Sequence, residues 1–280
     1  MSAPTMTKTA GPDGMMPTAA ARTTSTSLHR NIRHALVLAK RNLIKTWRTP
    51  EQLIDVTLQP IIFLALFVYV FGAAIGGGSR HAYLEYLLPG LLGQGIAMGS
   101  IALGQNMNAD IEKGVFDRFR SLPIARSVPL VGAVLADFAR YLILCVIYLG
   151  FGYAMGFRIH TDPLSLLGAV ILAIGFALCF CWVSLWVGLK ARTAGSVQGI
   201  MFLLIFPLAF GSSSYVSPKT MPGWLQGWNK VNPITRLVDS MRGLMVGGPA
   251  RDNLLLSFGW MALLLAVFVP LALRAYKVRS

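Results

Sequence analysis

Few side chains in this sequence of 280 residues are spaced for catalysis. The phosphate-binding pattern GxxxxGK[ST] does not occur, and no Ser–His–Asp set, pair of carboxylates or His/Cys cluster stands out. The three cysteines, Cys145, Cys179 and Cys181, all lie in apolar runs, which argues against a disulfide framework. We therefore expect a chain that is not an enzyme and that binds no metal and no cofactor of its own.

A short stretch that mixes charged and aromatic residues is the best candidate for contact with a partner protein. Residues 110–126 read DIEKGVFDRFRSLPIAR. Gly114 permits a sharp turn, Phe116 and Phe119 would share one face of a short helix, and Pro123 would end that helix. A short interfacial helix of this kind can act as a lever on a partner, and the alternative is an ordinary charged loop.

The composition indicates a polytopic membrane protein. Hydrophobic residues make up 55% of the chain and charged residues only 13%, with a mean hydropathy of +0.60. Soluble domains are about 25% charged, and disordered proteins show the reverse pattern. The net charge of +14 would suggest nucleic acid in a soluble protein. In a membrane protein it indicates basic loops that face anionic lipids, so we expect lipid contacts and no nucleic acid.

Apolar runs predict six transmembrane helices. The runs are continuous rather than alternating, which favours helices over a closed barrel. The expected spans are 53–75, 86–105, 128–155, 164–189, 197–210 and 254–273, of which the fifth is short. Most of the 25 Lys and Arg residues fall on the side of the two termini, which places both termini in the cytoplasm. The segment before the last span is a partial exception, because it is external and yet basic.

The region before the first span divides into two parts. Residues 1–27 are rich in Ala, Thr, Pro, Gly and Met and are expected to form a disordered cytoplasmic tail. Residues 28–49 repeat apolar residues at three- and four-residue steps and carry basic residues on the other faces. This pattern predicts an amphipathic helix in the membrane plane, with a soluble helix as the alternative. Residues 50–280 then form the all-α, six-span domain.

Three polar residues inside the predicted spans are functional candidates. Asp137 and Arg140 are one helical turn apart, so they can pair with each other. A local ion pair or a contact in a dimer is favoured over a proton relay. Gln94 could face a translocation path, while the nearby Gly95 and Gly99 would allow close packing of helices.

The segment between the last two spans, residues 211–253, alternates short apolar pieces with polar breaks. Trp224 is of a type that anchors proteins at interfacial depth. We expect a re-entrant hairpin on the outer side, where neighbouring protein or water covers its backbone. The alternative is a plain external loop with an interfacial helix.

Two parts of the sequence resemble a known family. The string EKGVFDRFRSLPIAR resembles the intracellular signature of type-2 ABC exporter permeases, and within them of the daunorubicin-resistance type. The strings MPGWL, NPIT and DSMRGL, which begin at residues 221, 232 and 239, resemble the family's external segment before the last span. The likeness extends from about residue 28 to the C-terminus.

The resemblance implies a transmembrane permease subunit that works with two partners. One is a separate ABC ATPase, which would use ATP and Mg²⁺, and the other is a second permease, either an identical copy or a paralogue. The resemblance assigns the ATPase contact to Glu112, Lys113, Gly114, Phe116, Arg118, Arg120, Leu122 and Pro123. It assigns the external gate to Trp224, Asn232, Pro233 and Arg242.

The expected function is ATP-driven export of a hydrophobic drug, antibiotic or lipid-like molecule across the inner (plasma) membrane of a bacterium. Export of a polysaccharide or glycolipid is the main alternative. An ion-coupled secondary transporter is a further alternative, which would use Asp137 as a relay. A membrane scaffold or an integral membrane enzyme would leave the charged segment at 110–126 without a role.

Overall fold

The computed structural model describes residues 50–114, 128–248 and 251–279, and every regular element in those ranges is a helix. The predicted tail at 1–27 and the predicted amphipathic helix at 28–49 lie outside them. The helices are α2 (Pro50–Leu66), η1, a π-helix (Phe67–Phe71), α3 (Gly72–Ile75), α4 (Arg80–Glu112), α6 (Val128–Ala154), α7 (Pro163–Lys190), α8 (Ala194–Phe210), η2, a 3₁₀ turn (Pro218–Thr220), α9 (Gly223–Val231), α10 (Pro233–Met245) and α11 (Arg251–Arg279).

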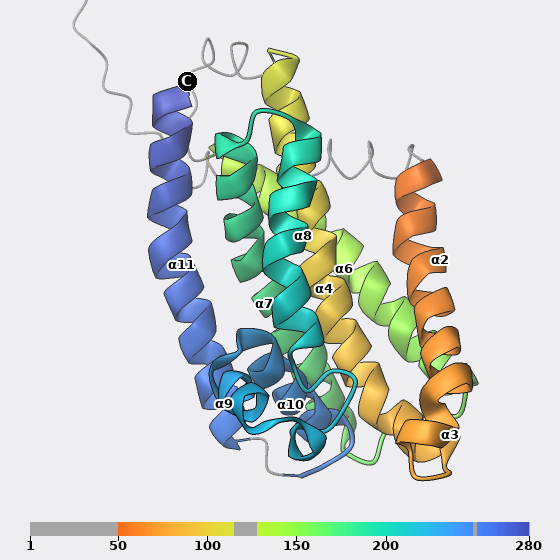
Figure 1. The fold of residues 1–280 in the computed structure, drawn as a ribbon. Coiled ribbons are helices and arrows are strands. Elements are labelled where there is room, and N and C mark those ends of the chain that lie inside the picture. The colour runs from red at the N-terminus through yellow and green to blue at the C-terminus, as the bar shows by residue number, and fades with distance from the viewer. Residues whose placement is uncertain (1–49, 115–127, 249–250, 280) are drawn as a thin grey trace, which may run out of the picture.

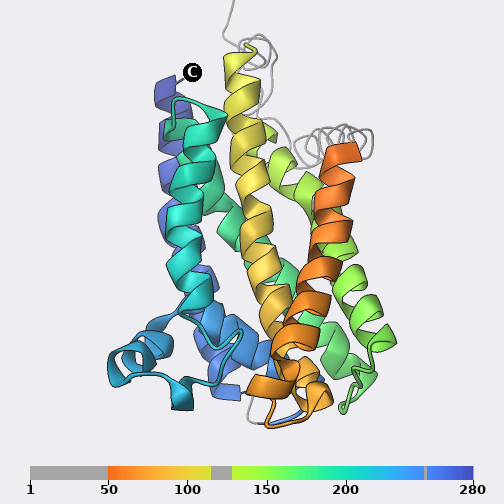
Figure 2. The same cartoon turned by 45° about the vertical axis from the view of Figure 1, so that its right-hand side comes forward.

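Five helical segments are long and apolar enough to cross a membrane. They are Thr57–Ile75, Arg80–Glu112, Leu130–Ala154, Pro163–Lys190 and Arg251–Val278. The apolar helix α8 has 17 residues and runs beside α4 and α7 in the same bundle (Figures 1 and 2). The prediction of an all-helical membrane protein is confirmed, and the sixth crossing stays a prediction.

The chain crosses the bundle back and forth between two ends. Helices α9 and α10 lie at one end, together with α3, and we call this the α10 end (Figure 1). The start of α2, the last turn of α4, the turn between α7 and α8, and the end of α11 lie at the other, which we call the Glu112 end. The first and last described residues therefore lie at the same end of the bundle.

Side-chain caps explain where two of the helices begin. Ser79 Oγ accepts the Ala82 N–H at 3.3 Å at the start of α4, and Thr193 Oγ1 accepts the Ser196 N–H at 3.2 Å at the start of α8. Helix α4 extends beyond the predicted span 86–105 at both ends. The apolar run marks only the middle of this helix, because its first turn is capped by Ser79 and its last two turns are polar.

Helix α4 lies at the centre of the bundle and packs against α6, α7, α8 and α10. Its glycines admit these neighbours. A Cβ atom on Gly95 would lie 3.0 Å from the Tyr148 ring, and one on Gly99 would lie 3.1 Å from the Tyr141 ring, both on α6. The prediction that these glycines serve close helix packing is confirmed.

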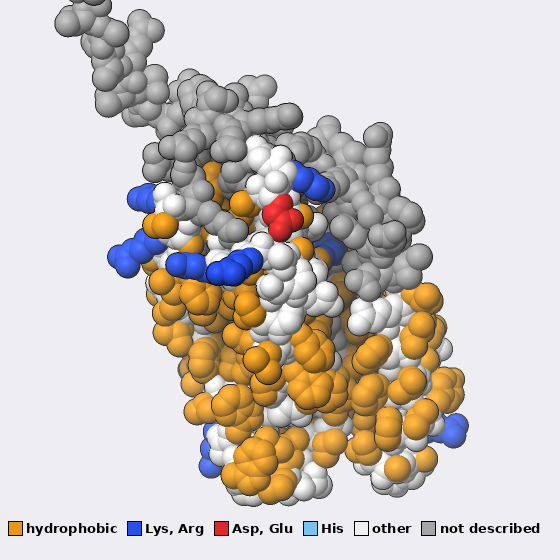
Figure 3. Space-filling view, turned by 45° about the horizontal axis from the view of Figure 1, so that its top comes forward, with side chains coloured by type: hydrophobic (Ala, Val, Ile, Leu, Met, Phe, Trp, Pro, Cys, Tyr) orange, Lys and Arg blue, Asp and Glu red, His pale blue; other side chains and the backbone are white. Residues whose placement is uncertain are grey.

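The outer surface is arranged like that of a protein embedded in lipid. Figure 3 shows hydrophobic side chains over the middle of the visible face, with Lys and Arg side chains toward the two ends. Large apolar residues of the long helices, such as Leu164, Leu203 and Leu255, are mostly exposed. A lipid phase is the solvent in which such exposure is stable.

Candidate functional site

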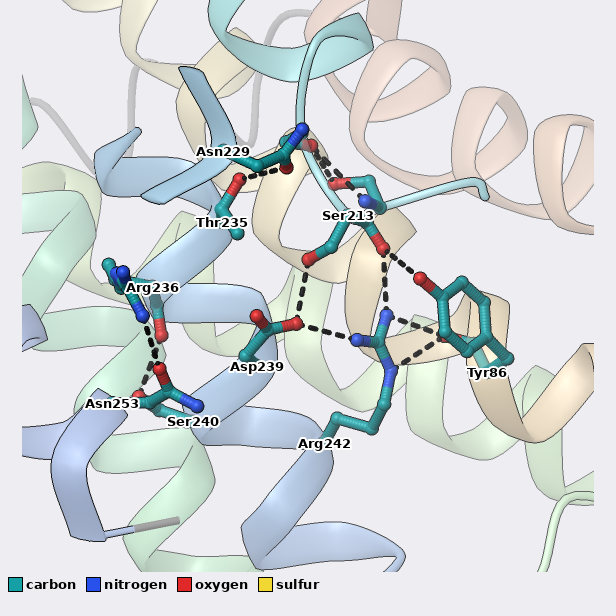
Figure 4. Close-up of polar contacts among 11 residues, drawn as sticks. Tyr86, Ser213, Asn229, Thr235, Arg236, Asp239, Ser240, Arg242 and Asn253 are labelled. Atoms are coloured by element: carbon teal, nitrogen blue, oxygen red, sulfur yellow. Dashed lines mark hydrogen bonds and ion pairs between the residues drawn. The ribbon is translucent and has the colours of Figure 1, made fainter. Parts of the chain in front are cut away.

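A set of polar residues at the α10 end joins three segments that are far apart in the sequence (Figure 4). Arg242 of α10 donates from Nη1 to Asp239 Oδ1 at 2.7 Å and from Nη2 to the Ser213 carbonyl at 2.9 Å. Its Nη2 and Nε also reach the Tyr86 carbonyl of α4, at 3.1 and 3.3 Å. We call Tyr86, Ser213, Asp239 and Arg242 the Arg242 node.

The other members of the node complete the network. The Tyr86 hydroxyl donates to the Ser213 carbonyl at 2.8 Å, and Ser213 Oγ donates to Asp239 Oδ1 at 2.7 Å. The Arg242 guanidinium carbon lies 3.8 Å from the centroid of the Tyr86 ring. Asp239 and Arg242 are three residues apart on α10, so both point to the same side of the helix. The node therefore fastens α10 and the loop after α8 to the start of α4.

The loop after α8 is held against α4 by two further contacts. A Cβ atom on Gly90 would lie 2.1 Å from the Ser214 carbonyl oxygen, so only glycine lets the loop backbone approach this closely. The Tyr215 hydroxyl donates to Gln94 Oε1 in the interior. Burial raises the pKa of Tyr215, so its hydroxyl stays protonated and can donate in alkaline solution as well as at neutral pH. Gln94 is buried here and holds the loop.

The predicted gate residues separate into two groups. Asn232 caps α10 by accepting the Ile234 N–H at 2.9 Å, while its Nδ2 donates to the Leu208 carbonyl of α8 at 2.7 Å. Pro233 is buried at the first position of α10, which suits a residue without an N–H. Trp224 on α9 is 76% exposed.

Helix α10 is also fastened to α11. Arg236 Nη1 donates to Asn253 Oδ1 at 2.8 Å, and the hydroxyls of Ser240 and Ser257 are 3.0 Å apart. Through these contacts and the node, α10 joins α4, α8 and α11 at one end of the bundle.

A row of aromatic rings leads from the node's loop to two helices. Along α8, the centroids of Phe202, Phe206 and Phe210 are 5.3 and 4.5 Å apart. Phe210 stacks on Tyr215 at 5.1 Å, and Tyr215 contacts Phe67 of η1 at 4.8 Å. The three α8 rings are more than a third exposed. This aromatic row offers flat apolar surfaces to a ligand or to lipid.

Asp137 and Arg140 form an isolated ion pair in α6. Arg140 Nη2 lies 3.6 Å from Asp137 Oδ2, and both side chains are largely buried. The Arg140 guanidinium also lies 5.5 Å from the centroid of the Tyr141 ring, whose hydroxyl is 3.2 Å from Cys181 Sγ of α7. Within the described residues, each of these two charged groups has only the other as its ion-pair partner.

The predicted ATPase contact begins where α4 ends. Glu112 is the last residue of α4, Lys113 is its C-cap, and both side chains are exposed. Gly114 has a φ of +64°, a conformation that favours glycine and turns the chain away from the helix axis. The other residues assigned to this contact, Phe116, Arg118, Arg120, Leu122 and Pro123, lie outside the described residues.

Three members of the node were not predicted from the sequence. Tyr86 and Ser213 are 156 and 29 residues from Arg242, and neither was a candidate. Asp239 was quoted only as part of a string, although its spacing from Arg242 on an amphipathic helix was a usable signal. Among the residues described by the structure, no three His, Cys, Asp or Glu side chains are grouped to hold a metal ion.

Comparison with known proteins agrees with the resemblance. The chain is 37% identical to the daunorubicin resistance ABC transporter permease protein DrrB1 of Streptomyces coeruleorubidus, over 82% of this chain and 81% of that protein. It is 27% identical to the probable doxorubicin resistance ABC transporter permease protein DrrC of Mycobacterium tuberculosis, over 85% and 86% of the two chains. It is 22% identical to the inner membrane transport permease YadH of Escherichia coli, over 68% and 75%.

These relatives are permease subunits, and the apolar helical bundle is a structure that such a subunit requires. The model of the ABC-2 type transporter family matches residues 33–246, which include the Arg242 node and most of the bundle. The chain therefore belongs to the ABC-2 type transporter family and is a permease subunit of an ABC exporter.

Proposed function

We propose that this permease exports a flat hydrophobic drug, using ATP hydrolysed by a separate ATPase that binds the Glu112 end. The proposal is supported by the two relatives that are named for daunorubicin and doxorubicin resistance. It includes a second permease chain, because each permease would form one half of the path. The location is the inner membrane of a bacterium, as the name of YadH states for that relative.

The observation that carries this proposal is the position of α4. This helix of 33 residues is about 50 Å long and reaches from one end of the bundle to the other. It leads directly into the predicted ATPase contact at Glu112, and its first turns hold the Arg242 node. A push on one end of α4 can thus reach the closed network at the other.

Two features support six crossings with both termini in the cytoplasm. Helix α8 runs from the Glu112 end to the α10 end, although its 17 residues span only about 25 Å. The segment that follows it, α9 and α10, returns into the bundle, and most of α10 is buried. With α8 as a crossing, this segment is a re-entrant hairpin on the outer side, and the Arg242 node closes the outer end of the path.

The aromatic row supports a flat substrate. Its exposed rings on α8 can stack on a planar apolar molecule. A polysaccharide, the alternative substrate, would need hydrogen-bonding groups along the same surface.

The test is transport by purified components. The permease would be reconstituted in lipid vesicles with the ABC ATPase that co-purifies with it, and doxorubicin movement would be followed by its fluorescence. We expect movement that requires both ATP and the ATPase. Movement driven by an ion gradient without the ATPase would contradict the proposal, and movement of a glycolipid but not of doxorubicin would contradict its substrate.

A matched pair of variants tests the ATPase contact. Glu112→Ala should lower doxorubicin movement per ATP hydrolysed by about tenfold, the scale of a typical coupling free energy. Asp252→Ala removes an exposed carboxylate at the opposite end of the bundle, at the start of α11, and should leave this ratio unchanged. Equal effects of the two variants would place the contact elsewhere.

A further inference from the structure

Helices α4 and α7 are parallel and contact each other in a constant register. The Gly104 N–H donates to Ser184 Oγ at 3.2 Å, and one turn later Asn108 Nδ2 donates to the Gly188 carbonyl at 3.1 Å. Both pairs are 80 residues apart in the sequence. A Cβ atom on Gly188 would lie 2.4 Å from the Gly104 carbonyl oxygen, so the two backbones touch. The register is therefore fixed by shape as well as by hydrogen bonds.

Asn108 extends this contact to the end of α7. Its Nδ2 also donates to the carbonyl of Ala191, the C-cap residue of α7, at 2.9 Å. Asn108 is 0% exposed, and both of its amide hydrogens are used in these two bonds. Carbonyls in the last turn of a helix have no partner within the helix and need an outside donor. We call Asn108, Gly188 and Ala191 the Asn108 clamp.

Helix α8 follows the clamp directly and is held by α4 at both of its ends. Near its start, Gln198 Oε1 accepts from Gln105 Nε2 at 3.2 Å. Beyond its end, the loop at Ser214 and Tyr215 is held by the contacts with Gly90 and Gln94. Helix α8 is thus attached to the same helix, α4, near its start and beyond its end.

The same hydrogen bonds could serve only to stabilise the fold. The position of Asn108 in α4 indicates a role in transmitting motion as well. Asn108 lies four residues, about one helical turn, before Glu112. Among the described residues, Asn108 is the last buried polar side chain of α4 before Glu112, so a displacement of Glu112 acts on the Asn108 clamp over about one helical turn. If α4 moved without the end of α7, the two hydrogen bonds of Asn108 would break and leave buried polar groups without partners. This free-energy cost favours movement of the two segments together.

We propose that Asn108 is a positioning residue that makes α4 and the turn between α7 and α8 move as one body. Displacement at Glu112 then carries α8, and with it the aromatic row and the loop of the Arg242 node. This inference depends on the proposed function, in which the ATPase acts at the segment after Glu112.

The first test replaces Asn108 by Asp, which has the same size but no amide hydrogens and sets a carboxylate against two carbonyls. We expect the complex to assemble and hydrolyse ATP at a rate within about twofold of the wild type. Doxorubicin moved per ATP hydrolysed should fall by about tenfold. The control is Asn106→Asp on the same helix, since the Asn106 side chain makes no hydrogen bond within the described residues. Normal transport per ATP in Asn108→Asp would overturn the inference.

The second test does not depend on the folding of that variant. Gln105→Cys and Gln198→Cys would be combined and joined by a short bifunctional thiol reagent; the native cysteines are buried. If α4 and α8 move as one body, the cross-linked permease should keep at least about half of its ATP-driven transport. A block that appears only in the cross-linked double variant, and not in either single variant with the reagent, would overturn the inference.

The outcomes separate this inference from the proposed function. If the wild-type permease and its ATPase move neither doxorubicin nor a glycolipid with ATP, the proposed function is wrong, and if they move only the glycolipid, the tests of Asn108 use the glycolipid instead. If they move either substrate, and Asn108→Asp moves it equally well per ATP, only the role of Asn108 is wrong.

Discussion

Replacing Arg242 by Met should release α10 from α4. The guanidinium makes four hydrogen-bond contacts, to Asp239, to the Ser213 carbonyl and twice to the Tyr86 carbonyl, and methionine can make none of them. The side chain of Met is of similar length and keeps the packing of the Arg stem. The change therefore removes the charge and the hydrogen bonds with little loss of volume.

The free-energy cost of Arg242→Met depends on which hydrogen-bond acceptors and charges lose their partners. The Ser213 carbonyl keeps the Tyr86 hydroxyl as a donor, and Asp239 keeps Ser213 Oγ, so these two acceptors each keep one donor, while the Tyr86 carbonyl loses both contacts with Arg242. The Asp239 carboxylate does lose its only cationic partner within the described residues. Its side chain is 26% exposed, so water screens part of this loss. We expect a cost of about 2–3 kcal/mol, below the 3–5 typical of a fully buried pair.

Amide hydrogen exchange measures this cost locally. A loss of about 2–3 kcal/mol raises the equilibrium constant for local opening by about 30- to 150-fold. Backbone amides of α10 should therefore exchange faster by this factor in lipid nanodiscs, whereas amides in the middle of α7 should not change.

The matched control is Arg236→Met on the same helix. Arg236 bonds to the Lys230 carbonyl and to Asn253, and not to α4. Two of its three hydrogen bonds are exposed to solvent, so its loss should speed exchange by less than about tenfold. Exchange in Arg242→Met that stays within about threefold of the wild type would refute the role of the node in holding α10.

Three further predictions concern other parts of the bundle. Gly90→Ala should cost at least about 2 kcal/mol in a thermal melt, because its Cβ would overlap the loop backbone, whereas Gly150→Ala on α6, with open space around it, should cost nothing. Burial raises the pKa of Tyr215 above the value of about 10 that it has in the unfolded chain. The stability that this shift contributes is complete below pH about 10 and is lost as pH rises through the pKa of the folded protein. Tyr215→Phe should therefore flatten the decline of the free energy of unfolding above pH about 10. Arg140→Met alone should destabilise the protein by about 3–5 kcal/mol, because it leaves the Asp137 carboxylate buried without its partner. The double variant Asp137→Leu with Arg140→Met should lose much less. Equal losses in the single and double variants would exclude a coupled ion pair.

The sequence predicts the long helices well and their ends poorly. Continuous apolar runs locate α6 and α7 to within one residue, and the segment from α2 to α3 and α11 to within about six, because lipid requires about 20 apolar residues in a row. The last two turns of α4 contain Asn106, Asn108 and Asp110, which hydropathy assigns to a loop. They are helical because α7 and α8 supply partners for polar side chains there, and a single sequence does not show such partners.

Some residues of the candidate site could be predicted from the sequence and others could not. Arg242, Asn232 and Pro233 were found through the resemblance, and the cap and proline that start α10 are readable from adjacent residues. Tyr86 and Ser213 join Arg242 only when α4 and α10 are brought together, and no local pattern contains that information. Asn108 gave no signal, since one asparagine near the end of an apolar run resembles any residue of a polar loop.

The parallel contact between α4 and α7 has a consequence for biosynthesis. Among the five long spans, α4 has the lowest hydropathy and the largest buried share, so it depends most on protein neighbours. Its partners for Asn108 lie about 80 residues further along, and those for Gln94 and Tyr86 lie beyond residue 210. A ribosome must therefore deliver α6, α7 and α8 before α4 can bury its amides. Until then, the polar side chains of nascent α4 lack their partners in the folded protein, and α4 is the least hydrophobic of the five long spans.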